Sequence, residues 1–285
     1  MQNLQGIFLM IGSQLGFALE DSLVKYSAEN LPMGLVIIML GAFGTLGFGA
    51  SLIRHGISPT DPVIYEPAFI ARTFGEFSGA AGFITTIWLI PLASASAILQ
   101  ATPLAVTAGA ALFFGETVRW RRWSAIAVGF VGVLMVIQPG GSDFQPASLM
   151  GIVAVFGLAL RDLATKKVSP QTHSALISFY GFAAIIPVGI VLLLIQGGAV
   201  MPSPMQFLFV LGAAAMGMSG YYAIVTATRI ADASVVTPFR YFRLIFALII
   251  GISIFGEKPN ALMLWGVVVI LGSGLYLMFR GQKAT

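Results

Sequence analysis

The sequence contains no cysteine, only two histidines (His55 and His173) and few charged residues. Without cysteine there is no disulfide framework, no thiol nucleophile and no thiolate metal site. Charged residues make up only 9% of the 285 positions and hydrophobic residues 58%, with a mean hydropathy of +0.93. A soluble domain has about 25% charged residues. This composition excludes a water-soluble globular domain, a disordered chain and a nucleic-acid-binding module.

Two further absences limit the chemistry. Neither histidine lies in the centre of an apolar run, and no acid–His–His spacing occurs, which argues against a metal site or a histidine-based intramembrane hydrolase. The phosphate-binding pattern Gly-x-x-x-x-Gly-Lys is also missing, so an ATP-driven pump has no support. The sequence therefore predicts a protein that is not an enzyme and that needs no metal and no cofactor.

Long apolar runs dominate the chain. A spanning helix needs about 20 apolar residues, and lipid tolerates only helices or closed barrels. The first run lacks a basic leading segment and predicts a retained helix instead of a cleaved signal. An all-α membrane protein with ten transmembrane helices follows from ten runs, Leu4–Tyr26, Met33–Ile53, Phe69–Ile90, Ala93–Phe114, Trp123–Gln138, Leu149–Thr165, Ser174–Ile195, Phe207–Thr228, Ala233–Phe255 and Leu262–Phe279.

The distribution of positive charge predicts the orientation. With the N-terminus in the cytoplasm, 11 of the 15 lysines and arginines fall on the cytoplasmic side, while Lys25 and Lys258 fall outside. Loops rich in lysine and arginine remain in the cytoplasm. We therefore expect both termini to be cytoplasmic, in a multi-pass protein of the bacterial inner membrane. Topology already explains the basic loops, so they are not interpreted as lipid-headgroup sites.

An internal repeat is the most informative feature. The segment GFALED beginning at Gly16 returns as GLALRD beginning at Gly157, an offset of 141 residues. Gly115-Glu116 and Gly256-Glu257 repeat at the same offset. The sequence thus predicts two five-helix repeats, residues 1–139 and 147–280. Because five is odd, the halves enter the membrane from opposite sides, the inverted topology of secondary transporters. The alternative is a duplication that was kept only for packing.

Here the motifs resemble a known family. The stretch LASASAILQATPL from Leu92 to Leu104, followed by Phe114-Gly115-Glu116, resembles the first EamA-type repeat of the drug/metabolite transporter superfamily, and residues 231–257 resemble its second repeat. The resemblance implies proton-linked or exchange transport of small organic molecules without ATP. The TPFRYFR segment, residues 237–243, is most similar to riboflavin and S-adenosylmethionine uptake permeases. Leu244 stands where the repeat usually has proline, and Arg243 where an acid is common, which bears on the substrate.

Charged residues inside the spans are the candidate substrate-binding residues. Arg240 and Arg243 lie in the ninth run, three positions apart and therefore on one helical face. Intramembrane charges are costly and mark functional sites, and Pro238 can open the helix nearby. We expect a cationic wall for a carboxylate, a phosphate or an electron-rich ring; the alternative is a structural pair neutralised by Glu76 or another acid. Glu76 itself can pair with Arg72, face Arg240 or a substrate, or carry a proton.

A second set of charges recurs at the ends of the first and sixth runs. Asp21 and Lys25 are four residues apart, as are Asp162 and Lys166, so each pair can form a salt bridge within its helix. The alternative interpretation is a pair of symmetric gates, one on each face of the membrane, formed by Glu20, Asp21, Lys25, Arg161, Asp162 and Lys166.

Polar and aromatic residues complete the candidates. Gln100 and Thr102 occupy the pseudo-equivalent positions of Arg240 and Phe242 to within one residue. Trp88, Tyr221 and Tyr241 are candidates for stacking on a ligand, with interfacial belts or packing as the alternative. Glu116 and Glu257 follow glycine at the ends of spans and are expected to be structural.

Together these features predict a secondary active transporter for a small organic metabolite. The best candidate is uptake of riboflavin or a similar cofactor or nucleoside-like metabolite. An exporter of amino acids or toxic metabolites has the same fold, since gradients set the direction. A non-transporting scaffold and an intramembrane enzyme are alternatives of other classes. The expected partners are a small molecule and the bilayer, without nucleic acid, and the sequence leaves monomer and homodimer open.

Overall fold

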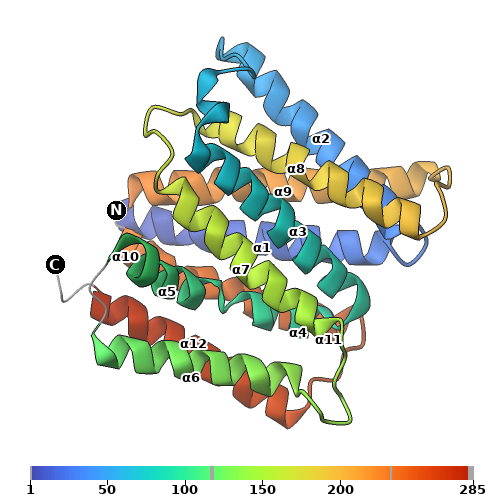
Figure 1. Ribbon diagram of the computed structural model, residues 1–285. Helices are drawn as coiled ribbons and strands as arrows, with labels where there is room; N and C mark the ends of the chain where they lie inside the picture. The colour runs from blue at the N-terminus through green and yellow to red at the C-terminus, as the bar shows by residue number, and fades with distance from the viewer. Residues whose placement is uncertain (1, 116–118, 232, 282–285) are drawn as a thin grey trace.

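The computed structural model describes residues 2–115, 119–231 and 233–281, and every regular element in these ranges is helical. Figure 1 shows the helices packed into one bundle. In chain order they are α1 (Gln2–Ser27), α2 (Met33–Arg54), η1 (Pro62–Tyr65), α3 (Pro67–Leu89), α4 (Leu92–Leu99), α5 (Thr102–Phe114), α6 (Trp120–Ile137), α7 (Ser148–Thr165), α8 (Ser174–Ile195), α9 (Pro204–Ile230), α10 (Ala233–Val236), η2 (Thr237–Tyr241), α11 (Phe242–Ser253) and α12 (Ala261–Gly281).

Local signals in the sequence set the helix ends. Proline occupies the first turn of α9, where Ser203 and Gln206 form a capping box that satisfies two orphan N–H groups. Gly115 ends α5 in the left-handed conformation, at φ 67°, which glycine adopts without strain. Because such breakers bound most of the apolar runs, the predicted ends lie within a few residues of the observed ones.

The fourth and ninth runs are not the continuous helices that the sequence predicted. Between α4 and α5 the chain makes a turn at Gln100 and Ala101. The ninth run breaks into α10, η2 and α11, with Pro238 at the start of the 3-10 segment. Pro103 follows the first break, in the first turn of α5, and Pro238 lies within the second, in η2. Proline has no backbone N–H, so each one removes a hydrogen bond from the regular helical pattern.

Seven helical segments of the described chain are long and apolar enough to cross a membrane. The other predicted spans depart from that pattern in different ways. Helix α3 carries Arg72 and Glu76, the ninth run is divided into short elements, and the described apolar part of α12 is Ala261–Leu277. The total of ten spans therefore stays a prediction.

The two halves of the chain are interleaved, not side by side. Helix α1 packs along α9, α2 along α8, α3 along α7 and α6 along α12 (Figure 1). Glycines permit the close approaches: a Cβ at Gly157 would overlap the backbone of Gly79, and one at Gly16 would touch Gly220. Every major helix pair thus joins the first half to the second.

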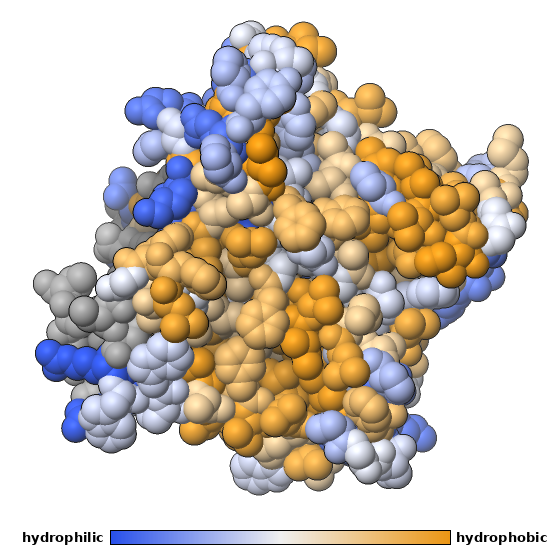
Figure 2. Space-filling model, viewed as in Figure 1, coloured by the Kyte–Doolittle hydropathy of each residue, from blue (hydrophilic) through white to orange (hydrophobic). Residues whose placement is uncertain are grey.

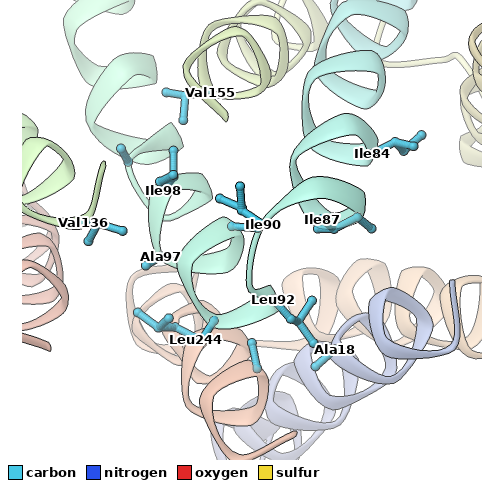
Figure 3. Packing of buried hydrophobic residues seen from close by; sticks show 14 of the residues in the cluster. Ala18, Ile84, Ile87, Ile90, Leu92, Ala97, Ile98, Val136, Val155 and Leu244 are labelled. Carbon is cyan, nitrogen blue, oxygen red and sulfur yellow. The ribbon is translucent and has the colours of Figure 1, made fainter. Parts of the chain in front are cut away.

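Helix α4 lies in the centre of the buried core. Figure 3 shows Leu92 beside Ala18 of α1 and Ala97 near Leu244 of α11, and each of these side chains is buried. On the outside, hydrophobic side chains cover the middle of the visible face and hydrophilic ones gather towards its edges (Figure 2). The start of α1 and the end of α12 lie at the same end of the bundle (Figure 1). The core therefore fixes the broken helices against α1.

Candidate functional site

One ion pair inside the bundle joins the ninth run to α1. Arg243 donates two hydrogen bonds to Oδ2 of Asp21, at 3.1 Å from Nε and 2.7 Å from Nη2. Its guanidinium also lies over the rings of Phe17 and Phe83, at 5.3 and 5.4 Å from their centroids. The acid that neutralises Arg243 is therefore Asp21, which fits the predicted alternative of Glu76 or another acid through its second member. The intrahelical pair of Asp21 with Lys25 is wrong, because Asp21 is bonded to Arg243 instead.

A second network joins α3 to α7. Glu76 accepts from Arg72 at 3.3 Å, which is one of the predicted alternatives, and from Arg161 across the interface at 3.3 Å. Arg161 also bonds to Asp162 at 2.8 Å. Arg72 is almost fully buried, and its Nε and Nη1 atoms have no partner in the described part of the chain. This network neutralises Glu76.

Two charged side chains near these helices belong to neither of the two networks. Arg240 and Glu20 form no ion pair with any side chain that the structure describes. Water can reach both side chains, although protein surrounds them. Asp162 and Arg161 lie within electrostatic range of Arg240, and Asp21 and Arg243 within range of Glu20. Both groups can therefore meet a ligand.

A polar cluster closes one end of the bundle. The Lys25 ammonium donates to the carbonyl oxygen of Ile90 at 2.8 Å and pairs with Glu257 at 3.4 Å. The Glu257 carboxylate accepts from the backbone N–H groups of Leu92 and, at 3.0 Å, Ala93, at the N-terminus of α4. A carboxylate is favourable there because it meets free N–H groups and the positive end of the helix dipole. We refer to these five residues as the Lys25 cluster.

The Lys25 cluster shows what the sequence missed. Glu257 was expected to be a structural residue at the end of a span, and it bonds to Lys25 of α1 and to the first two backbone N–H groups of α4. The partners Lys25 and Glu257 are 232 positions apart, so no local spacing could pair them. Beside the cluster lies a cavity of about 400 Å³ whose polar lining includes Gln138, Asp143 and Asn260. Glu116, the repeat partner of Glu257, lies outside the described residues.

The remaining candidates are dispersed. Tyr241 is buried against Gly274, and its hydroxyl has no partner among the described residues. Gln100 has an unpaired amide nitrogen within the same described set, and Thr102 donates to the carbonyl oxygen of Leu99 at 2.7 Å. Trp88 packs against the main core and Tyr221 lies edge-on to Phe48, with centroids 5.7 Å apart. Of these residues, Tyr241 directly adjoins Arg240 in the chain.

Apolar helices of spanning length, packed around paired charges, define a multi-pass membrane protein. The known proteins that this chain resembles are named as transporters. Residues 145–280 match the model of the EamA-like transporter family. The S-adenosylmethionine uptake transporter of Rickettsia felis is 26% identical, with 99% of this chain and 95% of that protein covered. The riboflavin transporter of Vibrio cholerae is 28% identical, with 99% of this chain and 95% of that protein covered.

Two further comparisons agree. The pseudopaline exporter of Pseudomonas aeruginosa is 25% identical, with 93% of each chain covered. A solved crystal structure covers 98% of each chain with a TM-score of 0.62 and 15% sequence identity, which shows a shared fold. The resemblance to EamA-type drug/metabolite transporters that the repeat motifs indicated is confirmed.

Proposed function

We propose that this protein is a secondary transporter that moves a small organic metabolite across the bacterial inner membrane. Its ten transmembrane helices form two inverted five-helix repeats, residues 1–139 and 147–280, with both termini in the cytoplasm. It binds its substrate between the repeats, near Arg240. Neither ATP nor a cofactor takes part in the cycle.

One observation supports the inverted repeat most strongly. The offset of 141 makes Gly157 the counterpart of Gly16, and Gly220 the counterpart of Gly79. The close contacts are Gly16 with Gly220 and Gly157 with Gly79. Exchanging the two halves therefore converts one contact into the other. A two-fold axis between like halves produces this reciprocity, and in the membrane plane such an axis supports alternating access.

Reporter fusions test the orientation. We expect a phosphatase that is active only in the periplasm to be silent when fused after Thr285, and a reporter that is active only in the cytoplasm to work there. The same two reporters inserted in the α6–α7 loop, after Gly141, should give the opposite pattern. Phosphatase activity at Thr285 would reverse the topology and remove the argument from inversion.

We propose that the Lys25 cluster is the outer gate. Its contacts hold together the outer ends of α1, α3 and α4 and the segment after α11, so the pathway opens there only when they separate. The offset of 141 assigns Lys166 and Glu116 to the inner gate. Glu20, Asp21, Arg161 and Asp162 lie deeper on the same two helices. They are proposed to couple the gates to the substrate.

The absence of native cysteine makes this gate directly testable. Ser96 lies on α4 and is buried, so a Ser96→Cys variant should react slowly with a membrane-impermeant maleimide added outside. Adding Glu257→Gln removes the ion pair to Lys25 and weakens the cap on α4, and labelling should accelerate several-fold. Glu29→Gln removes an exposed acid on the same side that lies within electrostatic range of Lys25 but is not one of the five residues of the cluster, so it controls for the change of charge alone. Equal labelling rates in all three proteins would remove the Lys25 cluster from gating.

The substrate and direction of transport need a flux assay. Proteoliposomes that contain the protein should accumulate more labelled riboflavin or S-adenosylmethionine than liposomes without it. Relatives that are named as transporters of these two compounds align with almost the whole chain. Net efflux of a preloaded amino-acid-like compound is the alternative favoured by the exporter relative. Flux of none of these compounds, with correctly inserted protein, would favour a scaffold instead.

A further inference from the structure

A groove that the proposed pathway does not use lies between α6 and α12, at the end where α6 begins. Its volume is about 420 Å³. Its lining includes Trp120, Arg121, Ser124 and Val128 of α6 and Ser273 and Tyr276 of α12. The two helices are each other's main partners and lie side by side at one edge of the bundle (Figure 1). Because Trp120 and Val128 are exposed, the groove opens to the outside of the bundle. We refer to it as the α6 groove.

The α6 groove is positively charged at one end and apolar along the rest. Within the described residues Arg121 and Arg122 form no ion pair, and the buried Nε atom of Arg122 has no hydrogen-bond partner. The Arg121 guanidinium lies 5.5 Å from the ring centre of Trp120, which is 73% exposed. Val128 and Val131 continue the same face of α6 and are half exposed. A ligand that matches this face therefore has an anionic end and an apolar end.

The repeat shows that the positive charge belongs to one end of the helix pair. Trp123 and Trp265 are related by an offset of 142, which applies along α6 and α12. The same offset makes Met263 the counterpart of Arg121, so the outer end has an apolar residue at this position. Membrane topology explains the sign of the charge. It does not require a groove beside the arginine or an exposed indole ring next to it.

The contact at the outer end provides a second comparison. Gln138, directly after α6, and Asn260, directly before α12, exchange two side-chain hydrogen bonds of 2.9 and 3.2 Å. Offsets of 141 and 142 make Arg119 the counterpart of Asn260 and Arg280 the counterpart of Gln138. Under the proposed two-fold relation, the inner end has two arginines where the outer end has two amides that bind each other. Like charges repel, and an anion between them neutralises both.

We propose that the α6 groove binds an anionic phospholipid of the inner leaflet, with its phosphate on Arg121 and Arg122 and its acyl chains along Val128 and Val131. This inference goes beyond the proposed transport function and shares with it only the orientation of the chain. Arginine forms paired hydrogen bonds to phosphate, and tryptophan and tyrosine favour the level of the headgroups. Anionic lipids attract basic segments at the cytoplasmic surface. The bound lipid fastens the inner ends of α6 and α12 together.

Two other ligands have the same phosphate chemistry but match only part of the groove. Inorganic phosphate would leave Val128 and the ring of Trp120 uncovered, so the apolar part would add nothing to its affinity. A phospholipid with a zwitterionic headgroup covers the apolar part, but its ammonium group would meet the arginines around the start of α6. An anionic lipid matches both the charge and the apolar surface.

Lipid binding to the purified full-length protein in an uncharged detergent tests the proposal. Native mass spectrometry counts the bound lipids when phosphatidylglycerol or phosphatidylcholine of the same chain length is added. We expect one phosphatidylglycerol to bind about tenfold more tightly, because only this headgroup has a net negative charge. Inorganic phosphate in large excess should not displace it. Equal binding of the two lipids, or displacement by phosphate, would overturn the assignment of an anionic lipid.

Two pairs of variants separate the charge from the groove. Arg121→Gln should weaken phosphatidylglycerol binding about fivefold, and Arg54→Gln, an exposed arginine at the end of α2 on the same proposed side, should change it by less than about twofold. Ser124→Phe keeps every charge but fills the groove from an exposed position, so it should weaken binding as strongly as Arg121→Gln. Val131→Phe, on the same face beyond the groove, should leave the affinity unchanged. Full affinity in Ser124→Phe, or equal losses in the two arginine variants, would refute the groove.

The lipid assay and the flux assay fail independently. Transport of riboflavin or S-adenosylmethionine by a protein that does not distinguish the two lipids would refute the lipid site and retain the transporter. Selective lipid binding by a protein that transports none of the compounds would retain the lipid site and refute the proposed transport. Phosphatase activity at Thr285 would place the α6 groove in the outer leaflet and refute the assignment to the inner one.

Discussion

The Arg243–Asp21 pair should contribute measurably to stability. Replacing Arg243 with glutamine removes two hydrogen bonds to one carboxylate oxygen and leaves Asp21, whose side chain is only 7% exposed, without its cation. Asp21→Asn instead leaves Arg243, which is 20% exposed and lies within electrostatic range of Glu20. Because the arginine can turn to Glu20, we expect the asparagine variant to be the milder of the two.

The expected size follows from burial and geometry. Removing one partner of a fully buried pair costs about 3–5 kcal/mol. Partial exposure of Arg243 reduces this cost, so we expect about 2–3 kcal/mol for Arg243→Gln and about 1–2 kcal/mol for Asp21→Asn. The double variant should cost at least about 1 kcal/mol less than the sum, because it leaves no unpaired charge behind.

Thermal melting in detergent, followed by the loss of monodisperse protein on size exclusion, measures these differences. For a protein of this size about 1 kcal/mol corresponds to roughly 2 °C, so Arg243→Gln should lower Tm by about 4–6 °C. Arg54→Gln, an exposed arginine at the end of α2, is the control and should change Tm by less than about 1 °C. If the double variant loses the full sum of the single effects, the pair is not coupled and the argument is wrong.

Three further outcomes follow from the packing and the site. Gly157→Ala forces a Cβ into the backbone of Gly79 and should lower the free energy of unfolding by about 1–3 kcal/mol. In the control, Gly12→Ala, the new Cβ has nothing within 4 Å, so the free energy of unfolding should rise by up to about 1 kcal/mol. Melting temperatures in the opposite order would contradict the close helix contact. Pro238→Ala should regularise η2, turn Arg240 away and lower uptake per inserted molecule without lowering abundance; unchanged uptake would separate the break from function. Arg240→Lys keeps the charge but loses the planar fork, so it should bind S-adenosylmethionine several-fold more weakly; full wild-type affinity would show that a point charge suffices.

Hydropathy was enough to predict most of the elements. The run Ser174–Ile195 coincides with α8, and Met33–Ile53 ends one residue before α2 does. Proline, glycine and capping residues lie at the boundaries, so local signals and length determine where these helices begin and end. The breaks at Gln100 and Pro238 were harder to predict, because an apolar run is equally apolar whether its backbone is α-helical, 3-10 or turned.

The site was only partly predictable. Intramembrane charge identified Arg240, Arg243 and Glu76 as candidates, and the spacing of Arg72 and Glu76 correctly offered an intrahelical bond. Partners on different helices were not accessible to this reasoning, because they depend on the rotation of each helix about its axis. Arg243 and Asp21 are 222 positions apart, and helical spacing along one chain carries no information on such a pair.

The interleaving of the halves has a consequence for biogenesis. Helices α1, α2 and α3 have their main partners in α9, α8 and α7, which the ribosome makes later. The first half therefore enters the bilayer before most of its packing surface exists, and the glycine-lined faces of α1 and α3 remain covered by lipid until synthesis approaches the end. Quality control has to tolerate that intermediate. A gene split between residues 139 and 147 should then yield stable protein only when both fragments are produced together.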